Sequence, residues 1–466
     1  MSVSLDPARY PLVPWPLNVE PRAGEVAVGT PELVTDPALG PEEYVLEVGD
    51  RGVSISAAGP KGHFYGRQTL RQLTGADGKA PAVRIEDSPR FRWRGLHLDV
   101  SRHFFPVPFI KKYIDLLAAY KLNVFHWHLT DDQGWRIEIR KYPRLTEIGS
   151  RRRETIVGHP RFPGVKRYDG KPHGGFYTQD EVREVVAYAR ERHVDVLPEI
   201  ELPGHSVAVF AAYPELCCGA PPREVATSWG IKEEVYCPHE RTFAFIEDVL
   251  SEVAALFPFE YFHIGGDEVP KKRWSQCAEA QAVMRREGLK DEEELQSWFV
   301  RRVGKILGGL GKSLIGWDEI LEGGLAPSAT VMSWRGIRGG ITAAKQGHDV
   351  IMCPEADMYF DHYQDDPRKE PLAIGGISPF EDVYGFEPVP VILKGDERDR
   401  VIGTQGCVWT EYMPDPDHVE YMTYPRALAL AEVAWTAADR HDFEAFTTRL
   451  GPELRWLDKQ VVNYRR

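Results

Sequence analysis

From about residue 94 onward, short apolar runs alternate with longer stretches whose apolar residues recur every three or four positions. The longer stretches predict helices over residues 109–120, 179–192, 241–256, 292–308 and 426–435. The short runs predict eight strands, over residues 95–100, 123–129, 195–202, 261–265, 313–319, 330–334, 349–353 and 401–408. This alternation is typical of repeated βα units around a parallel sheet.

Polar and aromatic residues follow the predicted strands at the point where each strand ends. They are Asp99, Arg102, His128, Asp131, Glu201, His205, Asp267, Glu268, Trp317, Asp318, Trp334, Trp409 and Glu411. A (β/α)8 TIM barrel builds its active site from the carboxyl ends of its strands, so this placement favours an α/β fold of that kind. A doubly wound sheet shares the same alternation and remains the alternative.

The first part of the chain follows a different pattern. Tyr44, Leu46 and Val48 alternate with more polar positions, and the turn sequence at 49–52 precedes a second alternating run, which predicts a two-stranded hairpin. A helix is expected over residues 63–73. This region therefore reads as a small α+β unit.

Residues 87–90, with Pro89 among them, interrupt regular structure and mark a domain boundary. We expect an α+β domain at 1–88, the barrel at 89–440, and a C-terminal helical extension at 441–466 that packs on the barrel. Two long connections, 151–177 and 361–390, are candidate loops at the rim of a site. The basic run from Arg151 to Arg153 is expected to be solvated.

Composition narrows the function classes. The 466 residues carry 57 Lys and Arg against 70 Asp and Glu, a net charge of 57 − 70 = −13, which argues against nucleic-acid or anionic membrane partners. No apolar run reaches about 18 residues, and the first residues lack the basic and apolar segments of a signal peptide. The six cysteines, including Cys217 and Cys218, show neither a disulfide framework nor a CxxC pattern. A reducing, cytoplasmic setting is therefore expected.

The strongest chemical signal is the sequence HIGGDE at 263–268. Neighbouring side chains on a strand point to opposite faces, so Asp267 and Glu268 share a site only if the backbone bends beyond the strand end. Gly265 and Gly266 permit such a bend. Two carboxyl groups this close raise the pKa of one of them, which suits a general acid. A solvated turn is the alternative interpretation.

Adjacent acids also limit the mechanism. A two-carboxylate glycosidase holds its acids on opposite sides of the sugar, about 5 Å apart when retaining and about 6.5–9.5 Å apart when inverting. Asp267 and Glu268 approach from one side. Either Glu201, Asp318 or Glu411 is the second acid, or the nucleophile comes from elsewhere.

Three of the 12 tryptophans, Trp317, Trp334 and Trp409, fall at or just beyond the ends of different predicted strands. Indoles at a barrel mouth form an apolar wall suited to a sugar face or an acetyl methyl. Tyr359 and Asp361, after the seventh strand, add a phenol and an acid to the same rim. Core packing remains the alternative for any single indole.

Several stretches resemble the family 20 glycoside hydrolases, the β-N-acetylhexosaminidases. In chain order they are RGLHLDVSRH at 94–103, LNVFHWHLTDDQGWR at 122–136, PEIELPGH at 198–205, HIGGDE at 263–268, GWDE at 316–319, SWR at 333–335 and WTE at 409–411. The N-terminal unit is similar to the small domain that precedes the family's barrel. The resemblance implies an exo-acting, retaining enzyme whose nucleophile is the substrate's own 2-acetamido group.

The resemblance also implies site roles. Glu268 would be the general acid and base, and Asp267 would orient the acetamido group and stabilise its developing charge. Tyr359 would donate to the acetamido oxygen, which attacks the anomeric carbon to give an oxazolinium ion. The remaining implied substrate-binding residues are the indoles Trp317, Trp334 and Trp409, the hydroxyl-binding Arg102, Asp361 and Glu411, and the supporting pair Asp131 and His205. A fourth indole of some members has no counterpart between residues 359 and 409.

Three other functions are open to test. His126 and His128 share one strand face and, with His205 and His263, would suit a metal-dependent hydrolase, although no HExxH or cysteine ligand set accompanies them. A P-loop at 308–313 is disfavoured because Ile306 stands where the motif needs glycine, so this string reads as a helix end. The third is a sugar-binding pseudoenzyme, which would not need the acid pair.

We expect the chemistry to need no metal and no organic cofactor. The expected partner is a small amino-sugar glycoside, and the protein is expected to be a monomer or a weak dimer.

Overall fold

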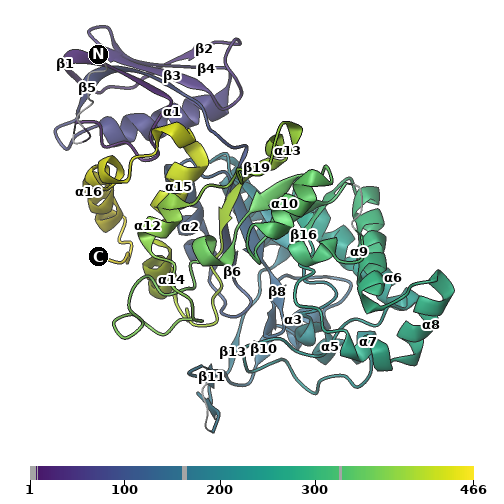
Figure 1. The fold of residues 1–466 in the computed structure, drawn as a ribbon. Coiled ribbons are helices and arrows are strands. Elements are labelled where there is room, and N and C mark those ends of the chain that lie inside the picture. Colours follow the sequence, from purple (N-terminus) through teal and green to yellow (C-terminus); the bar gives the residue numbers. More distant parts are fainter. Residues whose placement is uncertain (1–6, 8, 160–164, 325–327) are drawn as a thin grey trace.

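The computed structural model describes residues 7, 9–159, 165–324 and 328–466 (Figure 1). A five-stranded sheet with one helix, purple in Figure 1, precedes a closed barrel of eight parallel strands. The barrel strands are β6 (Trp93–Asp99), β7 (Val124–His128), β14 (Asp195–Glu199), β15 (Tyr261–His263), β16 (Ser313–Trp317), β17 (Thr330–Ser333), β18 (Val350–Met352) and β19 (Val401–Gly406).

Each barrel strand pairs with the next one along the chain, and β19 closes the barrel by pairing with β6, where Gly403 lies opposite Trp93. This closure confirms the TIM barrel and excludes the doubly wound sheet. All eight predicted strands are present. Several end earlier than predicted because regular strand pairing stops there; β16, for example, ends at Trp317 and the 3-10 turn η2 (Asp318–Leu321) follows.

The outer helices follow the predicted amphipathic stretches. The five that were predicted are α2 (Val107–Ala119), α4 (Gln179–Arg190), α6 (Glu240–Ala254), α9 (Glu292–Gly309) and α15 (Arg426–Trp435). The helix α10 (Arg338–Lys345) was not predicted, since two glycines in its eight residues weaken the helical pattern. Among the described residues, no helix is both long and apolar enough to cross a bilayer.

Short helices lie in the connections. They are α3 (Arg144–Glu147), α5 (Val207–Ala212), α7 (Lys272–Gln276), α8 (Ala278–Glu287), α11 (Glu355–Met358), α12 (Phe380–Gly385), α13 (Asp396–Asp399) and α14 (Pro416–Thr423). The string at 308–313 is a helix end, as predicted: α9 stops at Gly309, Gly311 has φ +72°, and β16 follows. The Lys312 ammonium donates hydrogen bonds to the carbonyls of Phe257 and Phe259. This lysine therefore has a structural role.

The N-terminal sheet consists of β1 (Asn18–Ala27), β2 (Glu32–Thr35), β3 (Tyr44–Gly49), β4 (Gly52–Ala57) and β5 (Lys79–Asp87), in the order β1-β5-β3-β4-β2. The predicted hairpin is β3 and β4, with Gly49 opposite Gly52. The helix α1 (Pro60–Leu73) packs on β3 and β4 and begins three residues earlier than expected. Pro60 suits that first helical position because it has no N–H to satisfy there.

The C-terminal helix α16 (Phe443–Lys459) joins the two domains. Its apolar face enters the barrel's core cluster through Phe446, Leu450 and Leu457. On the same buried face Arg449, which is 3% exposed, pairs with Glu432 and donates to the Leu12 carbonyl of the N-terminal segment. The two domains and the extension therefore share buried polar contacts.

The connection 151–177 forms two small ladders, β10 (Arg151–Arg152) with β13 (His173–Gly174) and β11 (Ile156–Val157) with β12 (Arg167–Tyr168). The prediction that the arginine run is solvated is wrong for Arg152, which is 2% exposed. Its guanidinium donates to Thr155 and lies 5.3 Å from the Trp229 ring centroid. Extended backbone sends alternate side chains to opposite faces, so the middle arginine points inward.

Candidate active site

The backbone turns sharply after β15. Gly265 has φ +68° and Gly266 has φ +95°, and even Glu268 has a positive φ of 48°. A Cβ on Gly265 would lie 1.9 Å from Oε2 of Glu201, so only glycine fits that position. The bend that the two glycines predicted is confirmed.

This bend brings two consecutive carboxylates to one imidazole. Nε2 of His205 lies 3.6 Å from Oδ2 of Asp267 and 3.4 Å from Oε2 of Glu268. The Asp267 side chain is 13% exposed and the Glu268 side chain 35%, so Glu268 is the more accessible acid. The pair is therefore part of a built site and not a solvated turn.

His205 connects the acid pair to a buried anionic group. Its Nδ1 lies 3.3 Å from carboxylate oxygens of both Asp131 and Asp132. Burial opposes a charge on this ring, but Asp131 and Asp267 hold the pKa of His205 well above its ordinary value. Asp131 also pairs with Arg102 at 3.0 Å. An imidazolium therefore faces both catalytic candidates.

The raised carboxyl pKa falls on Asp267. Burial raises the pKa of Asp267 to about 6, with Glu268 adding to the shift and the His205 charge working against it. At pH 7 this group is mostly ionised. The predicted shift in pKa thus falls on Asp267, the acid that the sequence resemblance relates to the acetamido group, and not on Glu268.

The four histidines of the metal-hydrolase alternative do not meet at one point. Three of them surround the buried carboxylate of Glu199, at 3.1 Å from His126, 2.5 Å from His128 and 2.8 Å from His263. His205 lies apart, between the aspartates and the acid pair. The imidazole nitrogens that would bind one catalytic ion are thus directed to two different places.

The predicted indole wall is brought together. The ring centroids of Trp317 and Trp409 are 5.8 Å apart, and Tyr359 lies 6.4 Å from Trp409 and 6.0 Å from Trp334, stacked on the latter. Trp317 is 1% exposed and donates its indole N–H to Glu199, so it forms the floor. Trp334 is only half-buried and offers more of its surface to a ligand.

The three hydroxyl-binding candidates also gather at this rim. Arg102 lies 3.6 Å from Glu411 and its guanidinium sits 5.1 Å from the Trp409 centroid. Burial and the Glu411 charge hold the pKa of Asp361 well above its ordinary value. One oxygen each of Asp267, Asp361 and Glu411 is buried without a hydrogen-bond partner among the described residues. Such acceptors suit a ligand rich in N–H and O–H groups.

Most of the chain matches models of one family. A model described as the glycosyl hydrolase family 20 catalytic domain matches residues 91–438, and one described as domain 2 of the same family matches residues 12–88. The chain belongs to glycosyl hydrolase family 20. This confirms the resemblance carried by the sequence motifs.

Relatives of this family 20 chain include a β-hexosaminidase of Porphyromonas gingivalis, 49% identical over 462 residues. That match covers 96% of this chain and 57% of the relative, so the chain spans little more than half of that protein. A β-hexosaminidase of Akkermansia muciniphila is 34% identical, with 98% and 92% covered.

Solved structures agree with these relatives. A β-N-acetylhexosaminidase matches with a TM-score of 0.90 at 32% identity, covering 98% of this chain and 97% of that one. An exo β-N-acetylglucosaminidase of Vibrio harveyi, in complex with N-acetylglucosamine, matches with a TM-score of 0.88 at 34% identity, covering 100% and 80%.

In this family 20 site, the candidates for a second acid are occupied elsewhere. Asp318 pairs with Arg335 at 2.6 Å, and Glu411 lies beside Arg102. Glu201 sits beneath Gly265, where burial and Asp267 hold its pKa well above the ordinary value. None of the three faces the acid pair as a free carboxylate.

Glu319 is a site residue that sequence reasoning missed. Its Oε2 accepts the indole N–H of Trp334 at 2.8 Å, and its Oε1 accepts the backbone N–H of Glu268 at 3.4 Å. Burial, Asp267 and Asp318 raise its pKa to about 8. Glu319 stands in the GWDE motif, but only the 3-10 turn η2 brings it back to the acid pair.

Proposed function

We propose that this protein is an exo-acting, retaining β-N-acetylhexosaminidase that hydrolyses terminal β-linked N-acetylglucosamine or N-acetylgalactosamine. The observation that carries the proposal is the single-sided acid pair: Asp267 and Glu268 both face His205, while the other nearby carboxylates are paired or buried. Retention then requires a nucleophile from the substrate. The substrate's 2-acetamido oxygen can serve as that nucleophile.

In the first step, the Glu268 carboxyl donates its proton to the glycosidic oxygen as the bond to the anomeric carbon breaks. The acetamido oxygen attacks that carbon from the opposite face and forms a cyclic oxazolinium ion. The Asp267 carboxylate accepts the acetamido N–H and stabilises the positive charge that develops on nitrogen. Because this charge exists only along the reaction path, the contribution of Asp267 is specific to the transition state.

In the second step, the Glu268 carboxylate removes a proton from water as the water attacks the anomeric carbon. The oxazolinium ring opens, and the product keeps the β configuration. Tyr359 donates to the acetamido oxygen, and the indoles of Trp317, Trp334 and Trp409 hold the methyl group. Holding the nucleophile close to its target supplies a high effective molarity.

The relatives support this assignment. Two of them are named β-hexosaminidases, and one similar solved structure is an exo β-N-acetylglucosaminidase in complex with N-acetylglucosamine. The proposed steps use side chains of this chain, the substrate's own acetamido group and water. We also propose a reducing, cytoplasmic setting, supported by six cysteines that are free of disulfides. Cell fractionation tests that setting.

A series of substrates that changes only the 2-substituent tests the mechanism. We expect turnover of an aryl N-acetyl-β-glucosaminide, a steep loss as the acetamide is fluorinated, the β product first by NMR, and strong inhibition by a thiazoline mimic of the oxazolinium ion. Efficient hydrolysis of the 2-hydroxy glucoside, or a sugar trapped on a carboxylate, would sink the mechanism. Tight sugar binding without any turnover would instead indicate a pseudoenzyme.

A further inference from the structure

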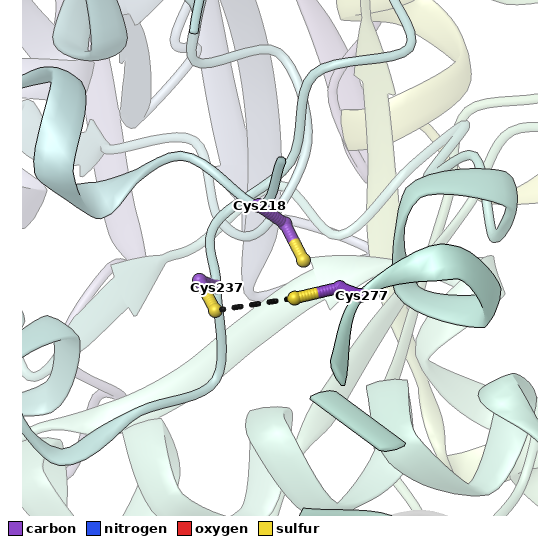
Figure 2. A group of neighbouring side chains, drawn as sticks. All are labelled: Cys218, Cys237 and Cys277. Carbon is purple, nitrogen blue, oxygen red and sulfur yellow. Dashed lines mark hydrogen bonds between the residues drawn. The ribbon is translucent and has the colours of Figure 1, made fainter. Parts of the chain in front are cut away.

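Three cysteines from separate segments gather outside the active site (Figure 2). The sulfur atoms of Cys218, Cys237 and Cys277 all lie within 4.8 Å of one another, and those of Cys237 and Cys277 are 3.9 Å apart. Cys218 and Cys237 are 0% and 3% exposed, and Cys277 is more open. Three thiols that point to a common centre are typical of a site for a metal ion that prefers thiolate ligands.

The backbone around the first two cysteines is tightly specified. The N–H of Cys218 donates to the Val235 carbonyl at 2.9 Å, and the N–H of Cys237 donates to the Leu216 carbonyl at 2.8 Å. These reciprocal bonds flank the bridge between Cys217 and Tyr236. The two sulfur positions are therefore set by main-chain pairing.

Cys277 arrives from the other side as the N-cap residue of α8. Its backbone N–H donates to the Trp274 carbonyl at 3.3 Å, and its carbonyl accepts the Gln281 N–H at 3.0 Å. Trp274, in the preceding helix α7, donates its indole N–H to the Tyr236 carbonyl at 2.9 Å and so holds α7 against the first two cysteines. Main-chain hydrogen bonds therefore also fix the position of Cys277.

We propose that this cluster binds a structural Zn²⁺ ion through three thiolates, with the carboxylate of Glu279 as the fourth ligand. Zn–S bonds of about 2.3 Å and Zn–O bonds of about 2.0 Å place tetrahedral ligands about 3.8 Å apart for two sulfurs and about 3.5 Å for sulfur and oxygen. The structure has 3.9 Å between the sulfurs of Cys237 and Cys277 and 3.3 Å between Cys237 Sγ and Glu279 Oε2.

Glu279 is a better fourth ligand than the neighbouring His239. The Nδ1 of His239 caps α6 by accepting the Thr242 N–H at 3.1 Å, so Nε2 carries the ring proton and donates it to the Glu215 carbonyl at 3.2 Å. Both ring nitrogens are therefore in use. The Glu279 side chain is 61% exposed and can rotate to complete the tetrahedron.

A disulfide explains the cluster less well. It would join two of the sulfurs at about 2.05 Å and leave the third without a role. The observed spacing exceeds that bond length, and all three sulfurs converge. A single zinc ion uses all of them.

The site would brace the segment that carries the acid pair. Cys218 and Cys237 belong to one small apolar cluster with Val269, Trp274 and Leu295. Val269 directly follows Glu268 in the chain. Glu268 stands 9 residues before Cys277 in the chain. The zinc would thus link the connection that contains Cys218 and Cys237 to the segment that follows the acid pair. It would not contact the reacting atoms.

Metal analysis of the purified protein is the first test. We expect about one zinc per chain, retained through dialysis, and a lower Tm after treatment with a strong chelator. Reconstitution with Co²⁺ should give the visible bands of tetrahedral thiolate ligation. These measurements use the unmodified chain, so they do not depend on whether a variant folds.

Single variants then assign the ligands. Cys218→Ser, Cys237→Ser and Cys277→Ser should each lose most of the zinc and the cobalt bands, and Glu279→Ala should weaken zinc binding by about tenfold or more. The matched control is Cys217→Ser, whose sulfur, among the described residues, contacts the carbonyls of Cys218 and Ala220. It should keep the full zinc content.

Three results would overturn the site: no zinc bound after reconstitution, equal zinc loss in Cys217→Ser and Cys218→Ser, or a disulfide among the three cysteines in the native protein by non-reducing peptide mapping. Hydrolytic activity does not enter these readouts. The zinc site and the proposed glycosidase function can therefore fail independently.

Discussion

The charge on His205 keeps Asp267 ionised in a buried site, and replacing His205 by Gln tests this directly. Glutamine can still hydrogen-bond but carries no charge. The imidazolium lowers the pKa of Asp267, while burial and Glu268 raise it, and the balance is about 6. Removing the cation must therefore raise the pKa of Asp267.

The size of the shift follows from the separation of the charges. At 3.6 Å between His205 Nε2 and Asp267 Oδ2, Coulomb's law gives about 4.6 kcal/mol for an effective dielectric constant near 20 and about 1.2 kcal/mol for water. These energies correspond to about 3.4 and about 0.8 pKa units. We expect a rise of about one to three units. Even one unit lowers the carboxylate fraction at pH 6 from about one half to about one tenth.

The assay is the pH dependence of kcat/KM for an aryl N-acetyl-β-glucosaminide at constant ionic strength, because this quantity reports groups of the free enzyme. The acid limb should lie near pH 6 in the unmodified protein and move up by at least about one unit in His205→Gln. His63→Gln, in the N-terminal domain, is the control and should leave the limb in place. An acid limb that stays or moves down in His205→Gln would refute the reasoning, whatever the absolute rate.

Three further predictions concern other parts of the molecule. Glu268→Gln should lower turnover by about 10²–10⁴-fold while binding persists, with larger losses for poorer leaving groups; equal losses across a leaving-group series would show that Glu268 is not the acid. Trp334→Ala should raise KM and lower kcat together, because in the proposed mechanism this half-buried indole holds the acetamide near its target. An unchanged kcat/KM would place Trp334 outside the site. Arg449→Met should lower the free energy of unfolding in urea by about 3–5 kcal/mol, since it leaves the buried Glu432 charge without its cation. Arg84→Met, at the partly exposed pair with Glu86, should lower it by less than about 1 kcal/mol. Similar losses for the two variants would contradict this account.

Much of the fold could be predicted because its signals are local. The alternation at 44–48 and the turn at 49–52 specify the hairpin of β3 and β4, and α15 occupies the residues that its period predicts. The two glycines before Asp267 imply a bend, because only a residue without a Cβ tolerates that close approach to Glu201. The predicted site residues also meet at one place, since they follow strands whose carboxyl ends share one rim. Their individual roles stay predictions.

Other features depend on contacts between distant segments, which no local period encodes. Closure of the barrel rests on the pairing of β19 with β6, and a doubly wound sheet would satisfy the same alternation. Glu319 reaches the acid pair only through η2, and three histidines meet around Glu199 only because β7, β14 and β15 are neighbours in the barrel. No spacing motif in the sequence predicts that Cys218, Cys237 and Cys277 converge. Main-chain pairing places the first two, and Cys277 lies at the N-cap position of α8. The sequence alone determined the elements and the kinds of chemistry available; the tertiary structure decided which groups face each other, and with that their charges.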